Sequence, residues 1–222
     1  MRALVRKTTP PPHDGMAQKF RFMSVDTRGR FGLSPVQAFL KRSFDLVASF
    51  LGLLCVLWLI AVAWLLATID TGMNGFFTQR RVGRHGRQFN VIKIRTMRPC
   101  GKVNSTVTTA LDHRITRLGR FWRQTKIDEL PQLFNVLLGQ MSLVGPRPHL
   151  PEEVAKYENY HRKALTVKPG ITGLAQVSGR SDLSFEEEVK LDVYYIENWT
   201  MMLDISILFR TPLAVFKHRE AE

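Results

Sequence analysis

The chain has 222 residues and a formal net charge of +13, from 32 lysine and arginine residues against 19 acidic ones. This length allows one domain with appendages and a modest core. The positive charge requires an anionic partner such as nucleic acid, lipid headgroups or a phosphorylated substrate. The two cysteines exclude a disulfide framework and indicate a reducing, cytosol-facing environment.

Residues 1–33 contain three consecutive prolines and few apolar groups, so they are predicted to form a disordered basic tail. Residues 34–70 are predicted to form a membrane-associated helix. Within it, the run from Leu46 to Ile69 carries no charge over 24 residues. As a helix this run would be about 36 Å long, which exceeds the ~30 Å hydrocarbon core of a bilayer. It begins too far into the chain and is too long for a signal peptide.

The sequence also predicts where this helix begins and how its ends are placed. Ser34 and Gln37 form a capping-box pattern around Pro35, so the helix should start at Pro35. Basic residues flank both ends, with Lys41 and Arg42 on one side and a group of arginines between positions 80 and 87 on the other. The positive-inside rule then favours a re-entrant helix with both ends in the cytoplasm. A straight single span is the alternative.

The residues after the helix predict a small soluble domain. Residues 75–83 and 88–95 are expected to form two short strands joined by a turn at 84–87. A loop follows at 99–109. A helix is then predicted to carry an arginine at every third position, comprising Arg114, Arg117, Arg120 and Arg123. The first three arginines fit a solvated or membrane-facing surface as well as they fit a functional site. Arg123 is expected to reach the acidic pair that follows.

That acidic pair, Asp128 and Glu129, is the most informative feature of the sequence. It follows a region, residues 71–127, with thirteen lysines and arginines against one acid. Apolar residues at helical spacing come next and end at Gly139, so Asp128 is predicted at the N-cap or in the first turn of a helix. An acid at that position commonly only caps free N–H groups, and on this motif alone that interpretation is the stronger one. The basic surroundings and the membrane segment nevertheless suggest chemistry on a phosphorylated lipid.

Two loops rich in glycine and proline, residues 144–148 and 168–180, present Arg147 and Arg180. Arginine suits phosphate because its planar fork can donate two hydrogen bonds at once. Residues 185–195 should be helical. The apolar stretch 199–216 is interrupted by charges and a proline, so it should lie at the membrane interface or in the core. The predicted fold is therefore α+β and mostly helical, with a membrane-embedded, re-entrant N-terminal helix, a small strand pair and interfacial amphipathic helices.

Many linked motifs in a fixed order resemble one known family, the bacterial sugar transferases, which are monotopic polyprenyl-phosphate phosphoglycosyl transferases. The resemblance covers residues 41–216. Its motifs are Lys41–Asp45, Phe76–Gln79, Val82–Gly83, Lys93–Met97, Arg114–Arg120, Asp128–Val136, Met141–Pro148 and Pro169–Gly173.

The resemblance implies that the enzyme transfers a sugar 1-phosphate from a UDP-sugar to undecaprenyl phosphate and releases UMP. This reaction is the first membrane step of exopolysaccharide, capsule or glycan biosynthesis. The implied location is the bacterial inner membrane, with residues 71–222 forming a catalytic domain that faces the cytoplasm. Anionic membrane lipids are expected partners, nucleic acid is not, and a homodimer is left open.

The resemblance also implies residue roles. Asp128 is the nucleophile and forms a covalent aspartyl-phosphosugar intermediate, while Glu129 helps to bind Mg²⁺ and handles the proton of the lipid phosphate. Both carboxylates are the expected ligands of the metal. The phosphates are expected to lie among basic side chains, namely Lys93, Arg123, Arg147 and Arg180.

One departure and three alternatives accompany this interpretation. Leu57 and Trp58 stand where the family has a Ser-Pro pair that breaks the membrane helix, which makes the re-entrant geometry less secure than the chemistry. The alternatives are a glycosyltransferase that releases UDP, a basic membrane adaptor without activity, and a nucleic-acid-binding protein. The last is the weakest because stacking aromatic residues are sparse in the basic region. The sequence does not identify the sugar.

Overall fold

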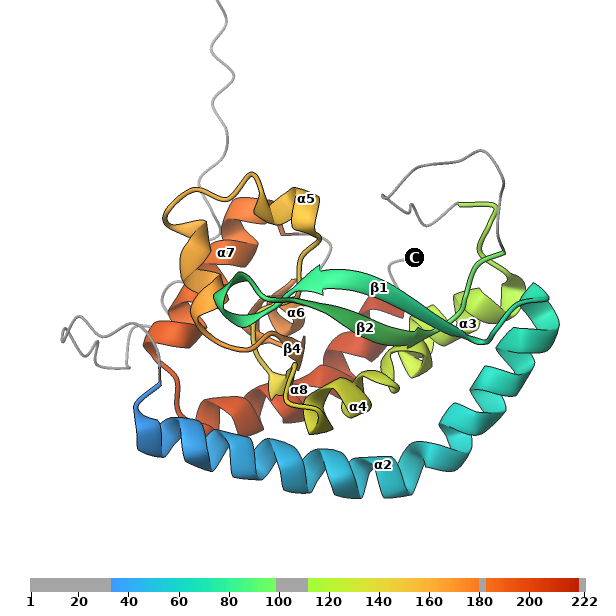
Figure 1. Ribbon diagram of the computed structural model, residues 1–222, viewed down its shortest axis with the longest axis horizontal. Helices are drawn as coiled ribbons and strands as arrows, with labels where there is room; N and C mark the ends of the chain where they lie inside the picture. Colours follow the sequence, from blue (N-terminus) through green and yellow to red (C-terminus); the bar gives the residue numbers. More distant parts are fainter. Residues whose placement is uncertain (1–32, 99–111, 180–182, 220–222) are drawn as a thin grey trace, which may run out of the picture.

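The computed structural model describes residues 33–98, 112–179 and 183–219 (Figure 1). One long helix, α2, runs along an edge of the molecule, and shorter helices and strands lie above it. The tail predicted at 1–33, apart from its last residue, and the loop predicted at 99–109 lie outside the described residues. The described part confirms a mostly helical protein with a small strand pair.

Helix α2 (Pro35–Thr71) begins where the sequence predicts. The Ser34 hydroxyl accepts a hydrogen bond from the Gln37 backbone N–H at 3.3 Å, and the Gln37 side chain accepts one from the Ser34 N–H at 2.9 Å. These two bonds satisfy donors that a helix start leaves free. The helix ends at Gly72, whose φ of 68° is typical of a left-handed C-terminal cap.

One face of α2 packs against the rest of the protein along its whole length. The buried positions are Lys41, Asp45, Ser49, Leu53, Ile60, Ala63, Ala67 and Thr71. The opposite face exposes large apolar side chains such as Leu57 and Trp58, which are 50% and 66% exposed. Among the described residues, α2 is the one helix long and apolar enough to cross a membrane.

Strands β1 (Phe76–Val82) and β2 (Gln88–Ile94) form the predicted antiparallel hairpin, with Phe76 opposite Ile94 and Val82 opposite Gln88. The turn between them contains a short 3₁₀ segment, Arg84–Gly86. Val91 and Ile94 are only 2% exposed and belong to two different apolar clusters, so both faces of β2 contact the core. The hairpin thereby fixes the side chains that point from β2 toward the centre of the molecule.

Helix α3 (Arg117–Thr125) is shorter than predicted. The Thr116 hydroxyl accepts a hydrogen bond from the Gly119 N–H at 2.8 Å and so sets the helix start. Arg114 lies before this cap and pairs instead with Asp112 at 2.5 Å. The expectation that Arg114 belongs to the helical arginine stripe is therefore wrong.

The chain then turns sharply at Lys126, whose φ is 59°. A 3₁₀ turn, η2 (Ile127–Glu129), precedes helix α4 (Gln132–Leu137). Asp128 is thus in the 3₁₀ turn and not at the start of α4, so its predicted place at the N-cap or in the first turn of that helix is wrong. The left-handed residue ends α3, and the short turn holds Asp128 and Glu129 ahead of α4.

The two loops rich in glycine and proline pair with each other, which the sequence did not predict. Strands β3 (Ser142–Val144) and β4 (Gly170–Thr172) are parallel neighbours. A Cβ atom on Gly170 would lie 2.1 Å from the Gly145 nitrogen, and one on Gly145 would lie 2.6 Å from the Lys168 carbonyl oxygen. Glycine is required at both positions because the two backbones approach so closely.

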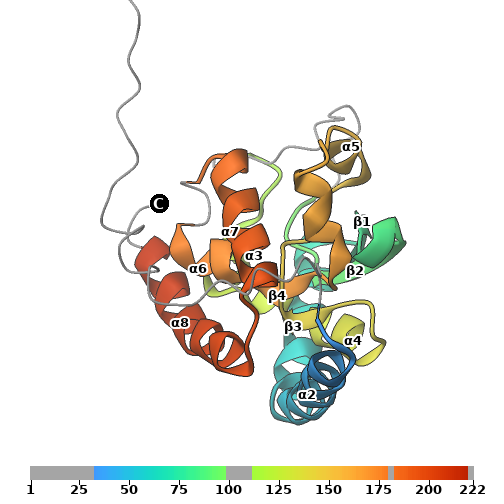
Figure 2. The same ribbon diagram turned by 90° about the vertical axis from the view of Figure 1, so that its left-hand side faces the viewer.

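The remaining elements close the core above α2. They are α5 (Pro151–Val154), η3 (His161–Thr166), α6 (Leu174–Ser178), α7 (Phe185–Glu197) and α8 (Met201–Arg219). Helix α8 continues through Pro212 and covers most of the apolar stretch that was expected at the membrane interface or in the core. Figure 2 shows α8 and α2 on the same lower side of the molecule.

A buried polar network joins α2 to this core. The Lys41 ammonium donates to Asp204 on α8 at 2.5 Å, and Asp204 also accepts from the Tyr195 hydroxyl at 2.7 Å. One turn further along α2, Asp45 accepts from the Ser142 hydroxyl and the Leu143 N–H, both at 3.0 Å. The long helix is therefore tied by hydrogen bonds to β3 and α8 as well as by apolar packing.

Candidate active site

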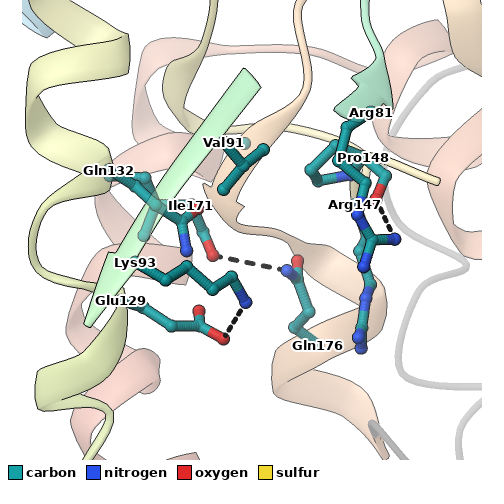
Figure 3. A pocket seen from close by; sticks show the side chains of 10 residues that line it. Arg81, Val91, Lys93, Glu129, Gln132, Arg147, Pro148, Ile171 and Gln176 are labelled. Atoms are coloured by element: carbon teal, nitrogen blue, oxygen red, sulfur yellow. Dashed lines mark hydrogen bonds and ion pairs between the residues drawn. The ribbon is translucent and has the colours of Figure 1, made fainter. Parts of the chain in front are cut away.

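A small polar cavity of about 30 Å³ lies where β2, η2, α4 and the paired loops meet (Figure 3). Its volume suffices for one or two water molecules. Its walls include Arg81, Val91, Lys93, Glu129, Gln132, Arg147, Pro148, Gly170, Ile171 and Gln176. The polar side chains of this wall thus come from β1, β2, η2, α4, the loop after residue 144 and the segment 174–178.

Cationic groups dominate this cavity. Lys93 on β2 pairs with Glu129 at 3.2 Å, and Arg81 and Arg147 lie on the opposite wall (Figure 3). The Arg81 guanidinium donates to the Pro148 carbonyl at 3.1 Å, which holds β1 against the loop that carries Arg147. Burial, and next the charge of Arg147, lower the pKa of Arg81. Three cations against one carboxylate suit an anionic ligand such as a phosphate or diphosphate.

Asp128 lies next to Glu129 but is buried, with 6% of its surface exposed, and does not line this cavity. Burial is the main cause that raises its pKa to about 6, and the charge of Glu129 acts in the same direction. The nearby cations Lys93, Lys126 and Arg123 oppose this shift. At pH 7 the carboxylate is therefore mostly ionised and can still take up a proton close to neutral pH.

The other predicted site residues are placed differently from one another. Lys93 and Arg147 both line the cavity. Arg123 does not; its guanidinium donates to the Thr96 hydroxyl at 2.9 Å, although it lies close enough to lower the pKa of Asp128. Arg180 lies outside the described residues.

Sequence reasoning missed three residues that line the cavity, namely Arg81, Gln132 and Gln176. Arg81 was counted among the charges flanking the membrane helix. The strand pattern offered a signal, since Arg81 and Lys93 lie on paired strands of one hairpin. Gln176 stood within a recognised glycine-rich motif, yet only the pairing of β3 with β4 brings its segment to the cavity.

The donor set fits a magnesium ion bound together with substrate. Within residues 33–98, 112–179 and 183–219, no three His, Cys, Asp or Glu side chains gather in a metal-binding cluster. Asp128 and Glu129 nevertheless supply two adjacent carboxylates, and the buried Oδ1 atom of Asp128 has no hydrogen-bond partner. Magnesium is commonly held by one or two carboxylates plus substrate phosphates and water, so a full protein cluster is not required.

Comparison with known proteins gives consistent names for relatives of this chain. It is 42% identical over 195 residues to the undecaprenyl-phosphate galactose phosphotransferase of Salmonella typhimurium, covering 81% of this chain and 41% of that protein. It is 40% identical to the undecaprenyl-phosphate glucose phosphotransferase of Komagataeibacter xylinus, covering 90% of this chain and 40% of the relative. The chain thus spans about two fifths of the length of these relatives.

A smaller relative matches over most of its own length. The exopolysaccharide production protein ExoY of Sinorhizobium fredii is 35% identical, and the match covers 82% of this chain and 88% of ExoY. The family model described as bacterial sugar transferase matches residues 36–218, which include α2, the hairpin, the cavity and nearly all of α8. The chain belongs to the bacterial sugar transferase family.

Proposed function

We propose that the chain is a phosphoglycosyl transferase that moves a sugar 1-phosphate from a UDP-sugar to undecaprenyl phosphate and releases UMP. The observation that carries the proposal is the Asp128–Glu129 pair in a family member. One carboxylate is buried with an unpartnered oxygen, and the other lines a cavity with Lys93, Arg81 and Arg147. The product begins the assembly of an exopolysaccharide, capsule or other glycan.

The names of the relatives support the identity of the acceptor more strongly than the identity of the donor. Two of them are named for transfer to undecaprenyl phosphate, one with galactose and the other with glucose. Because these relatives are about equally similar to this chain and differ in the sugar, similarity alone does not choose between hexoses. The donor of this chain is therefore assigned only to the class of UDP-sugars.

The proposed first step is attack by a carboxylate oxygen of Asp128 on the sugar-linked phosphorus of the donor. The new O–P bond replaces the bond from that phosphorus to the bridging oxygen, and UMP leaves with the bridging oxygen. In the second step an oxygen of the lipid phosphate attacks the same phosphorus. The acyl phosphate bond breaks, polyprenyl diphosphate sugar forms, and the Asp128 carboxylate is restored. A covalent step lets one site serve a soluble donor and then a lipid acceptor.

The charged side chains of the cavity have positioning roles in this proposal. Lys93, Arg81 and Arg147 hold the diphosphate of the donor, because both substrates are anions and their mutual repulsion must be offset. Glu129 accepts the proton that the lipid phosphate carries when it is a monoanion. Mg²⁺ would be held by Asp128 and Glu129 and, when bound, neutralises phosphate charge. Arg123 positions Thr96 and contributes positive potential near Asp128.

We further propose that α2 enters the cytoplasmic leaflet of the inner membrane and returns to the same side. Burial from Lys41 to Thr71 supports this placement, because both ends of α2 pack on one domain. Lys41 is engaged by the buried Asp204, so the contact with anionic headgroups would come from exposed cations such as Arg98, which pairs with Asp70 near the end of α2. The exposed apolar face of α2, which includes Leu57 and Trp58, would contact the acyl chains.

The test is an assay of the purified protein in lipid nanodiscs with undecaprenyl phosphate, Mg²⁺ and a panel of UDP-sugars, with UMP and UDP measured separately. We expect UMP release that requires Mg²⁺ and falls by at least about 1,000-fold in Asp128→Asn, because the amide is not a nucleophile. Asp192→Asn is the matched control, since Asp192 is another buried carboxylate and does not line the cavity.

Each alternative gives a different product in this assay. UDP release would indicate simple glycosyl transfer and would overturn the proposal. Full UMP release by Asp128→Asn would remove Asp128 as the nucleophile while leaving the overall reaction in place. A donor labelled with ³²P at the sugar-linked phosphate, supplied without acceptor, should label the wild-type protein and leave Asp128→Asn unlabelled.

A further inference from the structure

A second cavity, larger and of different chemistry, adjoins the polar one. Its volume is about 240 Å³, and it lies between α4, α6, α8 and the paired strands β3 and β4. Its walls are mainly aliphatic and include Leu130, Leu133, Leu143, Ile171, Leu208 and Val215. Nothing in the proposed roles of Asp128 and the basic side chains uses this space.

The two hydroxyl groups in its wall are already engaged within the protein, and its other polar side chains are Lys126, Glu129 and Gln176, of which Gln176 has a buried Oε1 atom without a hydrogen-bond partner. The Thr172 and Thr211 hydroxyls share a hydrogen bond at 2.8 Å, and the Thr211 hydroxyl lies 2.8 Å from the Ile207 carbonyl oxygen. A sugar or a uracil ring placed here would lose hydrogen bonds to water and gain few in return, which is costly. A hydrocarbon chain would gain from the same transfer.

The two cavities are continuous in their lining. Glu129, Ile171 and Gln176 belong to the walls of both. One side of this shared boundary is basic, with Lys93 and Arg147, whereas the other is aliphatic. A ligand that fills both spaces therefore carries an anionic group attached directly to an apolar chain.

The cavity also lies on the side where the proposed membrane contact is found. Helix α8 supplies one wall through Leu208, Ala214 and Val215 and exposes Phe209 and Leu213, which are 77% and 69% exposed. Figure 2 shows α8 on the same lower side as α2. An apolar chain that leaves the cavity past α8 would enter the acyl region that the outer face of α2 contacts.

We propose that this cavity binds the phosphate-proximal isoprene units of the acceptor, a polyprenyl phosphate, and aims its phosphate at the Glu129 boundary. The assignment rests on the proposed function for the identity of the acceptor. A phospholipid fits less well because its glycerol places two chains at a distance from the phosphate, whereas a single cavity here borders the basic side chains directly. In this proposal the cavity recognises the acceptor through the isoprene units attached to its phosphate.

The first experiment fills the cavity. Ala214→Phe places a ring in the wall, whereas Leu213→Phe places a ring on the exposed face of the same helix and is the control. We expect Ala214→Phe to raise the KM for undecaprenyl phosphate about tenfold and to leave the KM for the UDP-sugar unchanged, because it removes acceptor binding alone. Leu213→Phe should behave as the wild type. If Ala214→Phe lowers Tm, Val177→Phe fills the cavity from α6 with the same expected result.

The second experiment measures binding without turnover. A farnesyl phosphate carrying a diazirine on its first isoprene unit should label residues 171–177 or 208–215 in the wild-type protein. Undecaprenyl phosphate should compete, and Ala214→Phe should reduce labelling about tenfold, in proportion to its effect on KM. Labelling confined to α2, or equal labelling by a diazirine phosphatidylcholine, would overturn the assignment.

These readouts separate the two proposals. A raised KM for the UDP-sugar in Ala214→Phe would place the donor in the cavity and refute the inference while the proposed reaction stands. Suppose instead that the wild-type protein releases UMP from none of the UDP-sugars but is labelled in the cavity by the farnesyl probe. This result would refute the proposed function and support the prenyl phosphate site.

Discussion

At the scale of single residues, Asp128 carries a cost to stability. Its pKa is raised from 3.8 to about 6, mainly by burial, so the fold favours the protonated form over the ionised one. A shift of about two units corresponds to about 3 kcal/mol. Because the folded pKa lies above the unfolded one, this cost is fully present above pH 6 and disappears as the pH falls toward 4.

We therefore expect Asp128→Asn to raise the free energy of unfolding at pH 7.5, by up to about 3 kcal/mol, while turnover is lost. The amide has the shape of the carboxyl group and no charge to desolvate. Urea unfolding in detergent at fixed protein concentration measures the change. Asp112→Asn is the control of opposite sign, because Arg114 lowers the pKa of Asp112 to about 2 and the ionised form is favoured there. An Asp128→Asn protein less stable than wild type would contradict this account of Asp128.

The same carboxylate should control the pH dependence of the first chemical step. Only the ionised form attacks, so the burst of UMP from a UDP-sugar without acceptor should fall as the pH drops through about 6. The donor diphosphate does not titrate in this range, which isolates the enzyme group. In Lys126→Met the pH at which the burst falls should be higher, because the charge of Lys126 lowers the pKa of Asp128 in the wild type. A burst that stays constant down to pH 5 would show that Asp128 is not the titrating nucleophile.

At the scale of elements, the parallel pair β3–β4 positions the cavity because it brings the loop of Arg147 beside Gly170 and Gln176. We expect Gly170→Ala to reduce activity at least about tenfold and to lower Tm, since its Cβ would lie 2.1 Å from the Gly145 nitrogen and force the strands apart. Gly52→Ala is the control. Its Cβ would meet only Leu133 at an ordinary 3.7 Å, and alanine favours the helix by roughly 0.5–1 kcal/mol. Equal activity and Tm in the two variants would show that the strand contact is unimportant.

Local signals in the sequence predicted the elements that depend on local interactions. The Ser34–Gln37 cap, the hairpin from Phe76 to Ile94 and helix α7 all follow from patterns within a few residues. The left-handed turn at Lys126 and the β3–β4 pairing do not, because one has no glycine to mark it and the other joins segments 28 residues apart.

Some residues of the candidate site could also be predicted from the sequence, whereas others became visible only in the structure. Glu129 and Arg147 stood out from local charge and loop composition and Lys93 from the family resemblance, and the structure brings all three to one cavity. The roles of all six predicted site residues, Lys93, Arg123, Asp128, Glu129, Arg147 and Arg180, stay predictions. Arg81 and Gln176 were missed because their place in the wall depends on tertiary packing, which no spacing along the chain reveals.

At the scale of the whole molecule, α2 curves under the domain although no proline follows Pro35 in it (Figure 1). Ser49, Thr68 and Thr71 each donate a hydroxyl hydrogen bond to the carbonyl four residues earlier, at 2.5, 2.8 and 2.7 Å. Such bonds compete with the backbone ladder and bend helices, which offers a physical reason for curvature in the absence of the family's Ser-Pro pair.

We expect both ends of α2 to react from the cytoplasmic side alone. After replacement of Cys55 and Cys100 by serine, cysteines at Val36 and Met73 test the two ends, since these side chains are 67% and 40% exposed. A membrane-impermeant maleimide added to intact cells should label neither position, and the same reagent added to inverted vesicles should label both. Labelling of Met73→Cys in intact cells would demonstrate a straight span and refute the re-entrant proposal.

The hydrogen bonds of Asp45 to Ser142 and Leu143 have a consequence beyond stability. They fix α2 to the strand that leads, within three residues of Val144, to Arg147. In the proposed placement of α2 in one leaflet, a tilt imposed by a thicker or thinner bilayer would therefore reorient the cavity wall that carries Arg147 together with the helix. Hydrophobic thickness would then act as a control on turnover, so the rate in nanodiscs should change with acyl-chain length, and Asp45→Ala should weaken that dependence.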